Sequence, residues 1–148
     1  FKRNLTSLNT IQIKGGTRFQ KRLVLDIVNW YLKKMLPRVR TLDITIRLTQ
    51  CQEDSDAMGY CLELEDNRTF DIEIDKNMRM FDTVTTLCHE LTHLKQYYRK
   101  EMVHKNHGRI QWKKTMYGIY TKYSEQPWER EAFRMEKQLA LECFTEIL

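Results

Sequence analysis

The strongest constraint on the fold is a change of hydrophobic period along the chain. Three segments between residues 42 and 75 alternate apolar and polar side chains with a period of two, as half-buried strands do. We expect the apolar members to face the core, and Asp66-Asn67 to form the turn between the last two strands. These members are Leu42, Ile44, Ile46 and Leu48, then Tyr60, Leu62 and Leu64, then Phe70, Ile72 and Ile74.

Helical spacing flanks these segments on both sides. Thr17 is a suitable cap for a helix that runs to about Leu36, where Pro37 stops it. A second helix is predicted from about Phe81 to Tyr98, and a last one from Pro127 to about Ile147. Between these two, only a short hairpin around residues 110–120 is indicated. The grouping predicts an α+β fold: a small antiparallel sheet of about three strands packed with N-terminal, middle and C-terminal helices.

The bulk properties indicate one domain, residues 1–148, with no repeat, low-complexity tract or linker. No apolar run is long enough to cross a bilayer, and the first residues lack the apolar core of a signal peptide, so no membrane association and a cytoplasmic location are expected. Cys51, Cys61, Cys88 and Cys143 form no Cys-x-x-Cys pair, which favours small core residues in a reducing compartment. The net charge of +5 is compatible with a nucleic-acid or other acidic partner.

The segment His89-Glu90-Leu91-Thr92-His93 carries the most specific chemistry. Histidines four residues apart lie on one face of a helix and can share one Zn²⁺ ion. Glu90 is offset by about 100° around the helix, so its carboxylate can act on a water without binding the metal. On the predicted helix, both histidines lie on a polar face opposite the apolar stripe. The pattern therefore predicts a zinc site on a helix anchored in the core.

This segment, extended by Leu94-Lys95-Gln96-Tyr97, resembles the active-site helix of the zincin metallopeptidases. Together with Gln126-Pro-Trp-Glu-Arg-Glu-Ala132, it is similar to a group of small phage-encoded, SprT-like metallopeptidases. The resemblance covers roughly residues 59–139 and implies a zincin-like fold with a third zinc ligand further along the chain. It also implies hydrolysis of peptide bonds by a zinc-bound water with Glu90 as general base. A phage origin would place the protein in the cytoplasm of the host cell.

Two residues compete as the third ligand. Glu129 is similar to the glutamate that gluzincin-type enzymes supply from a later helix, and helix phasing places it inside the apolar stripe of the last helix. A carboxylate buried there needs a cation or hydrogen-bond donors. Glu136 falls in the same stripe and can accept a proton from the second nitrogen of His89 or His93.

His107 is the alternative third ligand, because His107-Gly108-Arg-Ile-Gln-Trp112 matches the pattern His-Gly-x-x-aromatic of SprT-type zincins. Its polar neighbours Lys105, Asn106 and Arg109 are instead typical of a solvated loop. If Glu129 is the ligand, His107 or a tyrosine can stabilise the oxyanion. The candidate tyrosines are Tyr97, Tyr120 and Tyr123.

The sequence thus predicts a zinc-dependent metalloendopeptidase acting on protein or peptide substrates. By resemblance, an extended substrate adds as a strand to the segment from about Thr69 to Ile74 or to its hairpin partner from Tyr60. Two other functions stay open: a catalytically inactive zinc-binding domain, and a basic nucleic-acid-binding domain. Any association with DNA would be weak and salt-sensitive, through basic residues spread around the first helix. These are Lys21, Arg22, Lys33, Lys34, Arg38 and Arg40.

Overall fold

The computed structural model describes residues 9–50, 58–64 and 66–148. The class is α+β, as predicted, and the three long helices begin and end within one residue of their predicted bounds. Two short 3₁₀ helices, η1 (Asn106–Gly108) and η2 (Tyr123–Glu125), lie in the segment before the last helix. The other elements are β1 (Thr10–Lys14), α1 (Arg18–Met35), β2 (Asp43–Thr49), β3 (Gly59–Glu63), β4 (Thr69–Asp75), α2 (Met80–Tyr98), β5 (Met102–His104), β6 (Ile110–Trp112), β7 (Thr115–Tyr117) and α3 (Pro127–Glu146).

The main sheet has four strands in the order β1-β2-β4-β3, and the expected antiparallel sheet of about three strands is wrong. β1 pairs with β2 and β2 with β4 in parallel, while only β3 and β4 are antiparallel. A parallel neighbour needs a crossover, and α1 supplies it between β1 and β2. β1 escaped notice because its alternation rests on two apolar residues alone, Ile11 and Ile13. β3 folds back as a hairpin on the outer side of β4, which leaves β4 to meet β2 in parallel.

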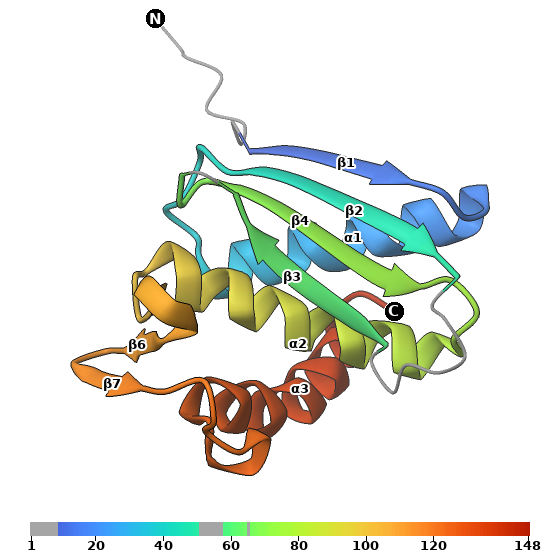
Figure 1. The fold of residues 1–148 in the computed structure, drawn as a ribbon. Coiled ribbons are helices and arrows are strands. Elements are labelled where there is room, and N and C mark those ends of the chain that lie inside the picture. Colours follow the sequence, from blue (N-terminus) through green and yellow to red (C-terminus); the bar gives the residue numbers. More distant parts are fainter. Residues whose placement is uncertain (1–8, 51–57, 65) are drawn as a thin grey trace, which may run out of the picture.

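The elements form layers (Figure 1). α1 and α2 cover one face of the sheet, and α3 packs against α2 on the side away from the sheet. A second, three-stranded antiparallel sheet of β5, β6 and β7 lies between the end of α2 and the start of α3. α2 is therefore the central element, with the sheet on one side and α3 on the other.

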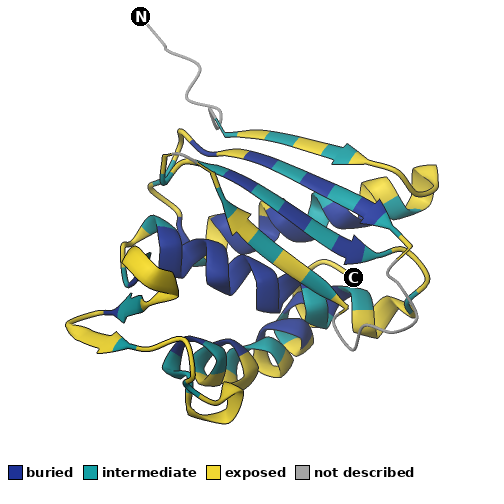
Figure 2. Ribbon diagram, viewed as in Figure 1, coloured by how far each residue is buried: buried dark blue, intermediate teal, exposed yellow. Residues whose placement is uncertain are grey.

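The core lies between the sheet and the two helices (Figure 2). As predicted, the apolar residues of β2 and β4 face it: Ile44, Ile46, Phe70, Ile72 and Ile74 are fully buried. The apolar stripe of α2 meets them from the other side, with Val84, Leu87, Leu91 and Leu94 also fully buried. Burial of this apolar surface is the main stabilising contribution to the fold.

The prediction that Tyr60, Leu62 and Leu64 face the core is wrong. Tyr60 and Leu62 are each 49% exposed, and Cys61 and Glu63 occupy the inner face of β3 instead. The reason is the register of β3, which turns Cys61 toward α2 and the margin of the core and leaves Tyr60 and Leu62 on the opposite face. Gly59 allows this close approach, because a Cβ there would lie 3.1 Å from the Thr86 methyl carbon and 2.8 Å from the Glu73 carbonyl oxygen.

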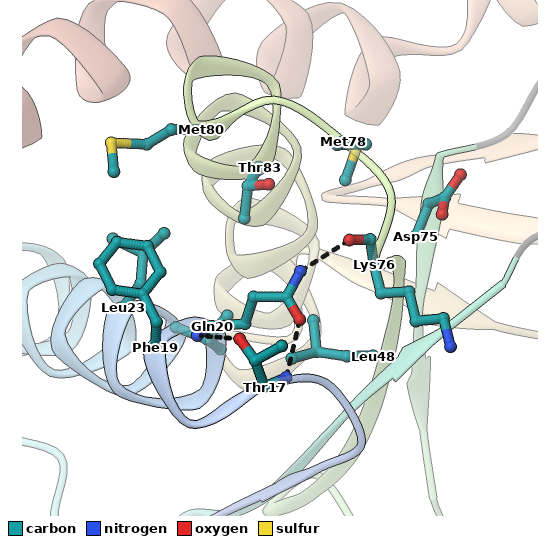
Figure 3. A pocket seen from close by; sticks show the side chains of 11 residues that line it. Thr17, Phe19, Gln20, Leu23, Leu48, Asp75, Lys76, Met78, Met80 and Thr83 are labelled. Atoms are coloured by element: carbon teal, nitrogen blue, oxygen red, sulfur yellow. Dashed lines mark hydrogen bonds between the residues drawn. The ribbon is translucent and has the colours of Figure 1, made fainter.

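The start of α1 is tied to the turn between β4 and α2 (Figure 3). Thr17 caps the helix as predicted, with its hydroxyl accepting from the Gln20 amide while the Gln20 side chain accepts from the Thr17 amide. The same Gln20 side chain donates to the Lys76 carbonyl oxygen at 2.7 Å. A pocket of about 290 Å³ lies at this corner, and neither His89 nor His93 of α2 lines it.

Within the described ranges, no helix combines the length and apolar character that crossing a bilayer requires. Cys88 and Cys143 are free and fully buried, as expected for core residues, whereas the free Cys61 is half-buried. Cys51 lies outside the described residues.

Candidate metal centre

The predicted site residues occupy the middle of α2, where the helix is buried on all sides. His89, Glu90 and His93 are only 8%, 6% and 7% exposed. The sequence places them on the polar face of an amphipathic helix, and the structure covers that face with α3. The helix is therefore held by apolar packing on one side and by polar contacts on the other.

His89, His93 and Glu129 converge on one point between α2 and α3. The Nε2 atoms of the two histidines lie 3.2 Å apart. Glu129 Oε1 lies 3.0 Å from His89 Nε2, and His93 Nε2 lies 3.2 Å from both oxygens of the Glu129 carboxylate. Among the described residues, this is the one group of three histidine, cysteine or acidic side chains arranged closely enough to hold a metal ion.

The other nitrogen of each ring is engaged by an acceptor. His89 Nδ1 donates to Glu136 Oε2 at 2.7 Å, and His93 Nδ1 donates to the Gln96 side-chain oxygen at 2.8 Å. Since each acceptor holds the ring proton on Nδ1, a neutral histidine turns the lone pair of its Nε2 toward the cluster. The sequence predicts that Glu136 accepts from either His89 or His93, and in the structure its partner is His89.

This arrangement fits a zinc ion. Ligands about 2.0–2.1 Å from a tetrahedral ion lie roughly 3.3–3.4 Å from one another, close to the separations found here. Two imidazole nitrogens and one carboxylate form a ligand set that zinc accepts in hydrolytic enzymes. Three electron-pair donors that meet in a buried place repel one another unless a cation, either a metal ion or a proton, lies among them.

Without a metal ion, protons satisfy the cluster. Burial lowers the pKa of His89, but its hydrogen bonds with Glu129 and Glu136 outweigh burial and raise the pKa to about 9. Burial likewise opposes ionisation of Glu129, but the hydrogen bonds from His89 and His93 hold the pKa of that carboxyl well below its usual range. A charged His–Glu network is thus the metal-free state, and a metal ion would displace its protons.

Glu90 follows His89 on α2 and is buried, but it does not belong to the cluster. In the described part of the chain, its carboxylate has no hydrogen-bond partner, and it lines a pocket together with His89. Burial raises the pKa of Glu90, while the neighbouring His93 and His89 act in the opposite direction. A carboxylate whose pKa is raised in this way binds a proton more readily than an exposed one, as a general base must.

Gln96 is a site residue that the sequence analysis did not single out. It is fully buried and, besides accepting from His93, donates from Nε2 to the Trp128 carbonyl oxygen and to Glu131, each at 3.0 Å. It therefore connects a histidine of α2 to the first turn of α3. Its spacing three residues after His93, on the same helix face, is the signal that could have found it.

The first turn of α3 brings Glu129 to the histidines. Pro127 begins the helix, as predicted, and Trp128 is buried against the small sheet through Trp112 and Tyr117. Tyr123, in η2, adds a hydrogen bond of 2.9 Å from its hydroxyl to Glu129 Oε1. The small sheet thus fixes the start of α3, and the helix then directs Glu129 toward α2.

The alternative third ligand, His107, does not join the cluster. It is exposed in η1, where it adopts a left-handed conformation with φ of 61° and ψ of 33°. Its polar neighbours keep this loop in solvent, so the cluster contains Glu129 and not His107. Tyr97 is buried near the site, but its hydroxyl pairs with His104 Nε2 at 2.9 Å. These positions do not test whether His107 or Tyr97 stabilises an oxyanion, and those roles stay predictions.

Compared with known proteins, the chain matches no family model, no curated protein and no solved structure.

Proposed function

We propose that the protein is a zinc-dependent metalloendopeptidase of the zincin type, with His89, His93 and Glu129 as metal ligands and Glu90 as general base. The observation that carries the proposal is the convergence of three electron-pair donors at 3.0–3.2 Å from one another. Each histidine is oriented by an acceptor on its other nitrogen, as metal-binding histidines usually are.

A zinc ion in such a site lowers the pKa of a water molecule and polarises the scissile carbonyl group. Glu90 accepts a proton from the attacking water as the new carbon–oxygen bond forms. It then donates that proton to the leaving nitrogen as the carbon–nitrogen bond breaks. Its burial and lack of a hydrogen-bond partner suit a group that changes protonation twice in one cycle.

The sheet offers an edge for an extended substrate. β4 pairs with a neighbour on both sides, so of the two candidate strands only β3, from Gly59 to Glu63, is an edge strand of the sheet that the described residues form. β3 also packs on α2. Its Cys61 lies close enough to Glu90 that the charge of the carboxylate, after burial, contributes to raising the pKa of the Cys61 thiol. A peptide added to β3 gains main-chain hydrogen bonds with little demand on its sequence.

The first experiment measures zinc stoichiometry by elemental analysis of wild type, Glu129→Ala and His107→Ala, with circular dichroism to check folding. We expect about one zinc ion per chain in wild type and in His107→Ala, and none in folded Glu129→Ala. Loss of zinc from His107→Ala alone would make His107 the ligand. A folded wild type that binds no divalent transition metal would contradict the proposal.

The second experiment compares hydrolysis of unstructured proteins by zinc-loaded wild type and Glu90→Gln. This substitution removes the base but keeps the size of the side chain, so we expect retained zinc and at least a 10²–10⁴-fold loss of turnover. Glu125→Gln, exposed in η2 before α3, is the matched control and leaves turnover unchanged. Equal turnover of Glu90→Gln and wild type would exclude Glu90 as the base. Zinc binding without hydrolysis of any protein would instead indicate the inactive zinc-binding domain.

The nucleic-acid-binding function makes a separate prediction. The six basic residues named around the first helix are all exposed. Two of them are partly neutralised, since Arg22 pairs with Asp26 and Lys34 with Glu142 and Glu146. Binding of DNA that persists in the folded double variant of His89 and His93, and that weakens with salt, would favour this function over the peptidase.

A further inference from the structure

A pocket of about 400 Å³ opens beside His89 and Glu90, toward the N-terminal half of α2. Its volume is within the range of small-ligand sites, about 300–1,000 Å³. Met58 and Gly59, at the start of β3, form one wall, and Phe133 of α3 contributes to another. The pocket therefore shares His89 with the candidate metal centre and reaches Gly59, the first residue of the edge strand β3.

The charge of this pocket is one-sided. Asp82, Glu90 and Glu136 line it, and no lysine or arginine among the described residues does. With a divalent ion bound, the histidines are neutral, and Glu129 adds a fourth carboxylate nearby. Four negative charges then face two positive ones, so the pocket attracts a cation even when the metal site is occupied.

The length of the pocket along α2 suits a long side chain, with the exposed Asp82 at its far end. Asp82 lies seven residues before His89 on the same helix, which corresponds to about 10 Å along the axis. Between the two, the pocket passes Thr85 and Thr86, with Met58 and Phe133 as apolar walls. Lysine and arginine match this layout, because they bury an apolar stem and place a charged end in a polar, solvated position.

The direction of β3 decides which substrate residue enters. β3 runs from Gly59, at the pocket, to Glu63, and antiparallel pairing is the more stable arrangement for an added strand. A peptide paired in this way has its C-terminal part beside Gly59. With the scissile bond at the metal centre, the residue next to the pocket is the one that follows this bond.

We propose that this pocket binds the lysine or arginine side chain that follows the scissile bond, with Asp82 pairing with the charged end. The inference rests on the proposed peptidase function and adds the substrate class to it. Asp82 also lies in the first turn of α2, where an acidic side chain stabilises a helix without any ligand. A purely structural role for Asp82 predicts a change in stability and no change in substrate preference.

The test uses zinc-loaded protein and three peptides that differ only after the scissile bond, with lysine, norleucine or glutamate there. Norleucine has the apolar stem of lysine without the charge. We expect kcat/KM to be roughly two- to fivefold higher for lysine than for norleucine, mostly through KM, and lowest for glutamate. In Asp82→Asn the lysine-to-norleucine ratio falls toward one, and in Asp82→Lys the glutamate peptide overtakes the lysine peptide.

Asp26→Asn, on the exposed side of α1, is the matched control and keeps the wild-type ratio. Binding of the same peptides to zinc-loaded Glu90→Gln gives a readout that needs no turnover, and lysine binds best there too. If either Asp82 variant does not fold, the loss of the wild-type lysine preference at high salt tests the same charge pairing.

Zinc-dependent hydrolysis without a lysine preference, or with a preference that survives Asp82→Asn, overturns this inference and leaves the peptidase function intact. Absence of zinc binding and of hydrolysis removes the peptidase function itself.

Discussion

Toward the sheet and α1, α2 presents Leu87, Leu91 and Leu94, whereas toward α3 it presents His89, His93 and Gln96. All six side chains are buried, yet their surroundings differ in kind. The leucines pack in a continuous apolar core with the strands. The polar residues form directed contacts, since each histidine nitrogen and the Gln96 carboxamide have named partners on α3 or within the helix.

One helix is thus stabilised by two separable kinds of contact. Apolar contacts are non-directional, so the loss of one side chain leaves a local cavity and little else. A buried polar network is reciprocal, because removing one member leaves its partners without hydrogen bonds. Damage on the sheet side should therefore lower stability without affecting the metal, and damage on the α3 side should affect the metal first.

A substitution on the sheet side of α2 should change stability most. Ile72→Ala removes a fully buried side chain of β4, and we expect the free energy of unfolding to fall by about 2–5 kcal/mol. The increment that zinc adds should be unchanged, about 4 kcal/mol at a thousandfold excess over its Kd. Urea unfolding with and without zinc measures both quantities. If zinc stabilises Ile72→Ala by less than it stabilises wild type, the two sides of α2 are coupled and are not stabilised separately.

The next effect is on the α3 side. Gln96→Leu removes the acceptor that orients His93 and the donor to the Trp128 carbonyl oxygen, so we expect zinc affinity to fall about 10–100-fold. Competition with a chelating dye measures the affinity. Gln138→Leu, exposed on α3, is the matched control and leaves it unchanged. Unaltered affinity in a folded Gln96→Leu protein would mean that His93 is held by the helix alone.

The sequence predicts features that depend on local signals, but not those that depend on contacts between distant segments. Helix bounds followed from local signals, since Thr17, Pro37 and Pro127 act on their own neighbours. The apolar faces of β2 and β4 were equally legible, because each buries every second residue. Strand order depends on contacts between distant segments, and neither the parallel pairing of β1 with β2 nor the edge position of β3 leaves a local signal.

Within the candidate site, spacing predicts which residues share a helix face but not which groups meet across helices. His89, Glu90 and His93 follow from one four-residue spacing, and the largely covered positions of Glu129 and Glu136 follow from the phase of the last helix. The choice between Glu129 and His107 required the packing of Trp128 on the small sheet, which no local pattern encodes. Gln96 was missed because a glutamine on a helix is usually a solvated residue.

The weakest effect is the pH dependence of stability in metal-free protein, where protons on the His–Glu network replace the metal ion. In metal-free protein the pKa of His89 is raised to about 9, from about 6.5 in an unfolded chain. Its contribution to stability is thus fully present below about pH 6.5 and is lost as the pH rises through about 9. The pKa of Glu129 is lowered from an ordinary value of 4.5, so its contribution is present above that pH and is lost as the pH falls.

Metal-free wild type should therefore exceed Glu129→Gln in stability most clearly between about pH 4.5 and 6.5. The difference should shrink by about 1 kcal/mol toward pH 10 as His89 loses its proton, because Glu136 shares with Glu129 in raising the pKa of His89. Zinc has the opposite dependence, because it must displace the same protons, so its stabilising increment should grow over the range in which the proton contribution fades. Urea unfolding of both proteins in chelator at several pH values, repeated for wild type with zinc, measures the two trends. Parallel pH profiles for metal-free wild type and Glu129→Gln would show that the α3 side of α2 is not held by a charged His–Glu network, and that its polar contacts need the metal ion to contribute to the fold.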